Sequence, residues 1–255
     1  MAIPIISVLS VEVCPLPTAI LSAHTGIKDF VIVDLTDRLN DFVQHYHKLN
    51  IHFDAIYSGF LASSDQVDIV LEIFSKLGKN ALKIADPVMG DMGEMYSTYT
   101  PELCHKMKAL VRIADVVTPN LTELCLLLDR EYPKDISFLL EDTISWVYDY
   151  MKEIADMGPK HVVVTGIRLQ DYVVTIGYDK LSNTFFEVKT PYVDMEISGT
   201  GDMFASVVCG NLLQGVSFQK ATELAANFVY KCVAYTKSAN ASNIIFEPLL
   251  KELLT

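Results

Sequence analysis

The sequence has few cysteines, and their arrangement defines no class of protein. Its 255 residues include five, an odd number, and no two stand at the C-x-x-C spacing that zinc ligands and redox pairs use. The chain therefore carries neither a disulfide framework nor a zinc signature. We expect most of these thiols to be buried, where they act as small apolar side chains.

Positive charge is also scarce. The chain has 20 Lys and Arg residues against 32 Asp and Glu residues, which gives a net charge of −12. A protein this acidic is not expected to bind nucleic acid or an anionic membrane surface non-specifically. The apolar stretch at residues 3–13 is interrupted by Pro4 and Glu12, follows no basic segment and is too short to cross a bilayer. We therefore expect a cytoplasmic protein.

Apolar residues, in contrast, make up 51% of the chain, enough for the core of one large domain. Short runs rich in Val and Ile alternate with segments of helical period. The predicted strands are residues 11–16, 55–58, 82–87, 116–118, 161–165, 172–178 and 185–188. The predicted helices are residues 66–77, 101–111, 122–128, 143–157, 201–213 and 218–237. This alternation predicts an α/β fold with a mostly parallel central sheet and helices on both faces. The last two predicted strands, residues 172–178 and 185–188, are predicted to form a hairpin at the sheet edge.

The most informative motif is Gly199-Thr200-Gly201-Asp202, which directly precedes an apolar, helix-compatible run. Two glycines allow a tight turn and a close approach of the backbone to a ligand. The first N–H groups of a helix have no intrahelical partner, and the helix dipole favours an anion beside them. A carboxylate there would repel a phosphate. We therefore interpret Asp202 as a base that takes a proton from an alcohol attacking the bound phosphoryl group. The alternative is an ordinary capping residue.

Three further motifs follow predicted strands, at the edge of a parallel sheet where ligands collect. Asp86 and Asp91 flank a Pro/Gly turn and are either metal ligands or parts of a capped turn. Asn120 and Glu123 are three residues apart, so both can face one side of a first helical turn. They are either metal ligands or a capping box. Thr165 ends a strand-like run and is either a phosphate ligand or part of a plain turn.

In this order, the four motifs together specify a phosphoryl transferase. Carboxylate and amide oxygens suit a hydrated Mg²⁺ ion. The Thr165 hydroxyl suits a nucleotide phosphate, and the Gly-Thr-Gly-Asp turn supplies an anion site and a base.

Six segments together carry a family resemblance. They are Ser22-Ala23-His24-Thr25-Gly26, Tyr57-Ser58-Gly59-Phe60, Asp86-Pro87-Val88-Met89-Gly90-Asp91 with Gly93 and Tyr96, Thr118-Pro119-Asn120-x-x-Glu123, Val164-Thr165-Gly166 and Gly199-Thr200-Gly201-Asp202. In these segments the sequence resembles the pyridoxal kinases of the ribokinase-like superfamily, in the vitamin B6 and hydroxymethylpyrimidine branch. Ser-x-His-Thr-Gly favours vitamin B6 kinases. The resemblance implies one ribokinase-like domain over residues 1–255. It also implies ATP-dependent phosphorylation of the 5′-hydroxymethyl group of a B6 vitamer, in salvage of pyridoxal 5′-phosphate.

The resemblance also implies roles at matching positions. Asp202 would be the base, and the transferred phosphoryl group would be stabilised by the amides of Gly199, Thr200 and Gly201. Mg²⁺ and its waters would be organised by Asp86, Asp91, Asn120 and Glu123. ATP would contact Thr165, Asn120, Gly199 and Gly201. The vitamer would contact Ser22, Thr25, Phe60 and Asp202, with Thr25 bonding its pyridine ring and Phe60 packing on it.

One departure from the family concerns the N-terminus. In the family a strand and a loop with a substrate-contacting serine come first, whereas residues 1–9 here resemble the later part of the helix that follows. Roughly 20–25 residues of that pattern are absent, enough for a strand, a loop and a helical turn. The neighbours of that strand would then lack a partner.

Three functions stay open on the sequence. The first is a B6 vitamer kinase. The second is a hydroxymethylpyrimidine kinase of thiamine synthesis, which would share every residue on the phosphate side. The third is a non-catalytic protein that binds the vitamer or the nucleotide. The resemblance and the high apolar content also predict a homodimer.

Overall fold

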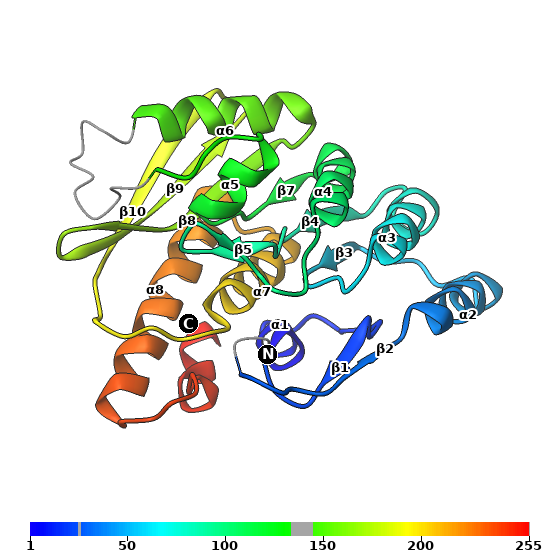
Figure 1. Ribbon diagram of the computed structural model, residues 1–255, viewed down its shortest axis with the longest axis horizontal. Helices are drawn as coiled ribbons and strands as arrows, with labels where there is room; N and C mark the ends of the chain where they lie inside the picture. The colour runs from blue at the N-terminus through cyan, green and yellow to red at the C-terminus, as the bar shows by residue number, and fades with distance from the viewer. Residues whose placement is uncertain (25–26, 134–144, 255) are drawn as a thin grey trace.

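The computed structural model describes residues 1–24, 27–133 and 145–254 (Figure 1). Six strands form its main sheet, in the order β10-β9-β8-β7-β4-β3. They are β3 Ala55–Ser58, β4 Leu82–Ala85, β7 Val116–Val117, β8 His161–Leu169, β9 Tyr172–Asp179 and β10 Thr184–Pro191. The four strands from β3 to β8 are parallel, whereas β9 and β10 are antiparallel and lie at one side. The predicted sheet and its edge hairpin are confirmed.

Helices cover both faces of this sheet, as predicted (Figure 1). One face packs on α3 Ser64–Lys76, α4 Pro101–Ile113, α5 Leu121–Leu127 and α6 Ser145–Met157. The other packs on α1 Ala2–Val8, α7 Thr200–Leu213, α8 Phe218–Ser238 and the 3₁₀ helix η3 Glu247–Leu254. In β8, Val162 and Val164 join the first core and Val163 joins the second, because successive strand side chains point to opposite faces. Two apolar cores therefore hold the sheet between two helical layers.

A smaller unit, which we call the hairpin lobe, lies beyond the β3 edge of the sheet (Figure 1). It consists of β1 Ala19–Leu21, β2 Ile32–Asp34 and α2 Thr36–Lys48. β1 and β2 pair antiparallel, and α2 packs on α3. A second short antiparallel pair, β5 Gly90–Asp91 and β6 Glu94–Met95, follows β4.

Two predictions about local structure are wrong. Residues 11–16 are not a strand, since the whole segment 11–17 is irregular. Pro15 and Pro17 have no backbone N–H to donate to a ladder, which accounts for this. Residue 165 does not end its strand: β8 continues to Leu169 through an irregularity between Val164 and Ile167. The helical character predicted for residues 1–9 is confirmed by α1. At the other end of the sheet from β10, β3 is an edge strand. Within the described ranges, no helix is long and apolar enough to span a bilayer.

Candidate active site

The site lies where the parallel strands end. Asp86 directly follows β4, Asn120 caps α5 just after β7, and Gly199 caps α7. Parallel strands present their carboxyl ends at one edge of the sheet, and the N-termini of α5 and α7 open at this edge. The sheet order therefore brings together residues that are more than a hundred positions apart in the sequence.

The Gly-Thr-Gly-Asp turn has the geometry of an anion site. Gly199 adopts a left-handed conformation with φ of 92° and begins α7 as its N-cap. Glycine accepts this conformation without strain. The N–H groups of the next residues have no partner within the helix, and the helix dipole adds positive potential there. Asp202 lies in this first turn, where the Ser206 hydroxyl donates to its backbone carbonyl at 2.5 Å.

Two acidic side chains and one tyrosine meet beside this turn. A methyl group placed on Gly59 would lie 3.7 Å from the Tyr57 hydroxyl and 3.9 Å from Asp202 Oδ1. A methyl group on Gly201 would lie 3.9 Å from Asp86 Oδ2. The Asp86 and Asp202 carboxyl groups therefore border one space at the ends of β3 and β4.

The proton affinity of both carboxyl groups in this space is raised. Burial raises the pKa of Asp202, against a lowering by the chain's amino terminus. Burial and then the charge of Asp202 raise the pKa of Asp86, although the Thr118 hydroxyl, 3.1 Å away, lowers it. Asp86 is 4% exposed and Asp202 is exposed to solvent, and two carboxylates that border one space favour a cation beside them. Their oxygens are the type of ligand that Mg²⁺ prefers, and this ion keeps several waters, so it needs few protein ligands.

Asn120 and Glu123 form a complete capping box. The Asn120 Oδ1 atom accepts from the Glu123 N–H at 3.0 Å, and Glu123 Oε2 accepts from the Asn120 N–H at 2.9 Å. Glu123 Oε1 also accepts from the Met89 N–H at 3.0 Å, and Asn120 Nδ2 donates to the Gly90 carbonyl at 2.8 Å. Burial and then the charge of Asp86 hold the pKa of Glu123 well above its usual range. The pair therefore fastens α5 to the turn that follows β4.

Asp91 lies at the rim of the site, where its carboxylate accepts from the Met92 N–H at 2.8 Å. Thr165 lies next to Asn120: the two residues form an isolated parallel bridge, and the Thr165 N–H donates to the Pro119 carbonyl at 3.0 Å. Gly166, with φ of 74°, allows the bend in β8 at this point. Over the described residues, no three His, Cys, Asp or Glu side chains are grouped closely enough to hold a metal ion.

Besides Asp202, two of the residues predicted for the vitamer side, Ser22 and Phe60, lie in the loops that follow β1 and β3. Ser22 follows β1, and its hydroxyl accepts from the Val31 N–H at 2.8 Å. Phe60 follows β3 and packs edge-on against Tyr99, with 6.3 Å between ring centroids. The Thr18 hydroxyl donates to the Phe60 carbonyl at 3.1 Å, which joins the hairpin lobe to this loop. Thr25 lies outside the described residues.

Two tyrosines near the carboxylates received no role from the sequence. Burial and then the charges of Asp86 and Asp202 hold the pKa of Tyr57 well above its usual range. Burial, followed by the charge of Glu123, raises the pKa of Tyr96. The available signal for Tyr57 was its position near the end of the predicted strand 55–58, just before Gly59.

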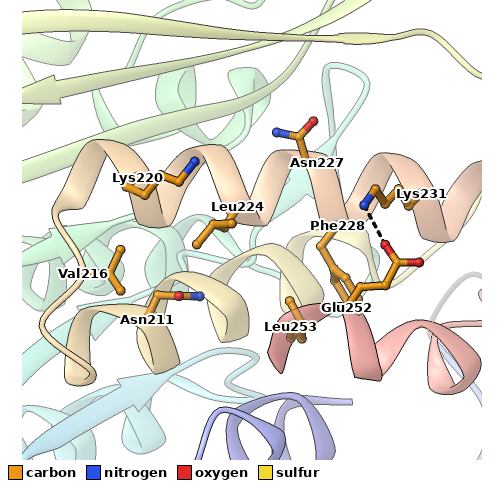
Figure 2. Close-up of a pocket in the computed structure, with 9 residues that line it drawn as sticks. All are labelled: Asn211, Val216, Lys220, Leu224, Asn227, Phe228, Lys231, Glu252 and Leu253. Atoms are coloured by element: carbon orange, nitrogen blue, oxygen red, sulfur yellow. Dashed lines mark hydrogen bonds and ion pairs between the residues drawn. The ribbon is translucent and has the colours of Figure 1, made fainter. Parts of the chain in front are cut away.

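A cavity of about 340 Å³ lies away from this site, between α7, α8 and η3. Figure 2 shows that Lys231 on α8 points toward Glu252, with which it forms an ion pair at 2.6 Å. None of the predicted site residues lines this cavity.

Comparison with known proteins defines the class. The sequence profile of the phosphomethylpyrimidine kinase family matches residues 18–246. The chain belongs to this family and is therefore a kinase, which confirms the predicted branch of the ribokinase-like superfamily. A solved structure from Bacteroides thetaiotaomicron, assigned to the phosphomethylpyrimidine kinases, has a TM-score of 0.92 and is 36% identical. That match covers 100% of this chain and 88% of the other. Another crystal form of that protein, 35% identical here over 100% of this chain and 89% of its own, contains pyridoxal.

Curated relatives include pyridoxal and thiamine enzymes. Pyridoxal kinase PdxY of Histophilus somni is 28% identical over 243 residues, covering 91% of this chain and 81% of its own. The chloroplastic thiamine biosynthetic bifunctional enzyme of Arabidopsis thaliana is 29% identical over 217 residues. The match with that enzyme covers 85% of this chain but 38% of the longer protein.

Proposed function

We propose that the chain, as one domain over residues 1–255, phosphorylates the 5′-hydroxymethyl group of a vitamin B6 vitamer with ATP. The observation that carries this proposal is the position of Asp202, in the first turn of α7 directly after the left-handed Gly199. This places a carboxylate beside unpaired N–H groups, as transfer from a phosphate to an alcohol requires. The pyridoxal-containing structure of the Bacteroides relative supports the choice of vitamer.

In the proposed reaction, the alcohol oxygen forms a bond to the γ-phosphorus of ATP while the bond from that phosphorus to the ADP oxygen breaks. Asp202 accepts the alcohol proton, and its raised pKa makes it a better acceptor. The N–H groups of Gly199, Thr200 and Gly201 hold the oxygens of the transferred group in place. The Thr165 hydroxyl and the Asn120 side chain bind the nucleotide phosphates.

Magnesium fits the same edge. Asp86 and Asp91 would hold the ion through direct bonds or waters, while Asn120 and Glu123 orient the turn between them. The ion, when bound, neutralises phosphate charge during transfer. On the vitamer side, Phe60 offers an aromatic face, and Ser22 and Thr25 offer polar contacts to the ring.

Turnover of three alcohols decides between the two kinase functions. Purified protein with ATP and Mg²⁺ is assayed side by side on pyridoxal, pyridoxamine and hydroxymethylpyrimidine. We expect the highest kcat/KM with a B6 vitamer. A higher kcat/KM with hydroxymethylpyrimidine would assign the chain to thiamine synthesis, which its family and its plant relative both favour. Binding of ATP and pyridoxal without turnover would indicate a non-catalytic binding protein.

We also propose a homodimer that forms through the hairpin lobe. Ile20 and Val33 are paired across β1 and β2, so both point to the same face of the hairpin, and they are 59% and 52% exposed. Val31, two residues from Val33, adds a side chain that is 64% exposed. Exposed apolar side chains gathered on one face are typical of a partner surface. Sedimentation that shows only monomer at micromolar concentration would exclude the dimer.

A further inference from the structure

Gln66 is a buried side chain that forms hydrogen bonds through both its amide oxygen and its amide nitrogen at the junction between the hairpin lobe and the sheet. It lies in the first turn of α3 and is 0% exposed. Its Oε1 atom accepts from the Ala62 N–H at 2.8 Å. Its Nε2 atom lies 2.8 Å from the Thr18 carbonyl, 2.9 Å from Thr36 Oγ1 and 3.1 Å from Asp34 Oδ1.

These bonds link α3 to the segment before β1, to the connection between β2 and α2, and to the loop after β3. Thr18 precedes β1, Asp34 ends β2 and Thr36 begins α2, so all three acceptors belong to the lobe or its first connection. Ala62 lies in the loop after β3, which also carries Phe60. The same bonds are reinforced within the lobe, because the Leu35 N–H donates to the Thr18 carbonyl at 3.0 Å.

The polar cluster extends directly to the vitamer side. The Thr18 hydroxyl donates to the Phe60 carbonyl, while the Thr18 carbonyl accepts from Gln66. Ser22 lies four residues further along the same chain segment. The position of Ser22 relative to Phe60 is therefore set through Thr18 and Gln66. The residues proposed for ATP, in contrast, lie on α5, β8 and α7 and make no bond to this cluster in the described parts of the chain.

We propose that Gln66 is a positioning residue that fixes the hairpin lobe against the loop after β3 and so shapes the vitamer side of the site. The expected change in the KM for pyridoxal rests on the proposed function, whereas the role of Gln66 in fixing the lobe does not. A buried amide is suited to the task because it donates and accepts at once, and a buried polar group that loses its partners is costly.

Gln66→Glu tests the proposal with little change in volume. The variant keeps an acceptor for the Ala62 N–H but places an oxygen against the Thr18 carbonyl and the Asp34 carboxylate. We expect the KM for pyridoxal to rise roughly tenfold or more while the KM for ATP stays within about twofold. Gln214→Glu is the control for the added charge, since the exposed Gln214 side chain also donates its amide to a backbone carbonyl, that of Leu9 at 2.8 Å, far from the lobe. It should leave both KM values unchanged.

A second substitution checks the mechanism. In the Gln66→Glu background, Asp34→Asn supplies an amide that can donate to the new carboxylate, which reverses the wild-type direction of this hydrogen bond. We therefore expect the KM for pyridoxal to fall part of the way back to the wild-type value. Equal rises in the KM for ATP and pyridoxal, or a lower melting temperature with both KM values unchanged, would overturn the positioning role.

Hydrogen exchange provides a readout without turnover. In Gln66→Glu, the amides of Leu35 and Thr36, which bond to Thr18 and Asp34, should exchange faster, while those of α7 should not change. If the wild-type chain phosphorylates no vitamer, the proposed function fails, and this exchange pattern still decides whether Gln66 fixes the lobe. Unchanged exchange at Leu35 and Thr36 would show that it does not.

Discussion

The Glu123 carboxylate accepts the Met89 N–H at 3.0 Å, which ties the first turn of α5 to the turn after β4. Its other oxygen accepts the Asn120 N–H, so a single buried side chain satisfies two backbone donors. Asp86 and Asp91 lie at the two ends of the turn that is held in this way. The position of both carboxylates relative to α5 therefore depends on Glu123.

Glu123→Ala should lower both stability and metal affinity. The buried Met89 N–H and the part-buried Asn120 N–H lose their acceptor, and a buried unsatisfied group costs about 1–3 kcal/mol in the free energy of unfolding. The turn that carries Asp91 loosens, so we expect turnover to require more Mg²⁺, while vitamer KM changes less. Urea denaturation and Mg²⁺ titrations of activity measure the two effects. A destabilised variant with an unchanged Mg²⁺ titration would leave Glu123 as a helix cap alone.

Gly59→Ala should reduce turnover without loss of stability. Gly59 does not have a positive φ, and the added methyl group would make only ordinary contacts, 3.7 Å from the Tyr57 hydroxyl and 3.9 Å from Asp202 Oδ1. It would, however, occupy the space beside the proposed base. We expect kcat/KM for the alcohol to fall roughly tenfold or more, because small displacements of a reacting group are costly.

Gly215→Ala is the contrasting control for this variant. Gly215 has φ of 77° and open space around its α-carbon, so alanine there should cost roughly 1–2 kcal/mol of stability and leave turnover intact. If Gly59→Ala kept the wild-type kcat/KM, the alcohol would not bind in the space beside Gly59.

His161 should make the fold less stable in mild acid. Its ring stacks on Phe218 at 4.3 Å between centroids, and its Nδ1 atom has no hydrogen-bond partner among the described residues. Burial lowers the pKa of His161 below its usual 6.5, although Asp179, 3.8 Å away, raises it. The folded protein thus binds this proton more weakly than the unfolded chain, so stability present above pH 6.5 declines as the pH falls toward the folded pKa.

His161→Phe keeps the stacking and removes the titration. Urea denaturation at pH values above and below 6.5 should therefore show a smaller loss of unfolding free energy in the variant than in the wild type. Equal losses in the two proteins would mean that protonation of His161 is not linked to folding.

Much of this account follows from local patterns. The i, i+3 spacing of Asn120 and Glu123 predicted two side chains on one side of a helical turn, and the structure contains them as a capping box. Gly199 and the apolar run after it predicted a helix that opens at a glycine turn, which α7 confirms. Such features depend on residues that are neighbours in the chain.

Features that depend on distant contacts could not be predicted. In the sequence Gln66 is only the first residue of the predicted helix 66–77, whereas in the structure it is fully buried and bonds to Thr18 and Asp34. Tyr57 fits an apolar strand, and its proximity to Asp202 follows only from the order of the sheet. The bend at Thr165 depends on the pairing of β8 with β9.

The central claim is that Asp202 is the base of a phosphoryl transfer. Asp202→Asn keeps the size of the side chain and the N–H groups of the α7 turn but cannot accept the alcohol proton. Steady-state turnover with ATP and pyridoxal, combined with calorimetric titration of ATP, tests this most directly. We predict that kcat falls ~10²–10⁴-fold, while the Kd for ATP stays nearly unchanged. A variant that retains more than about half of the wild-type kcat would show that Asp202 is not the base.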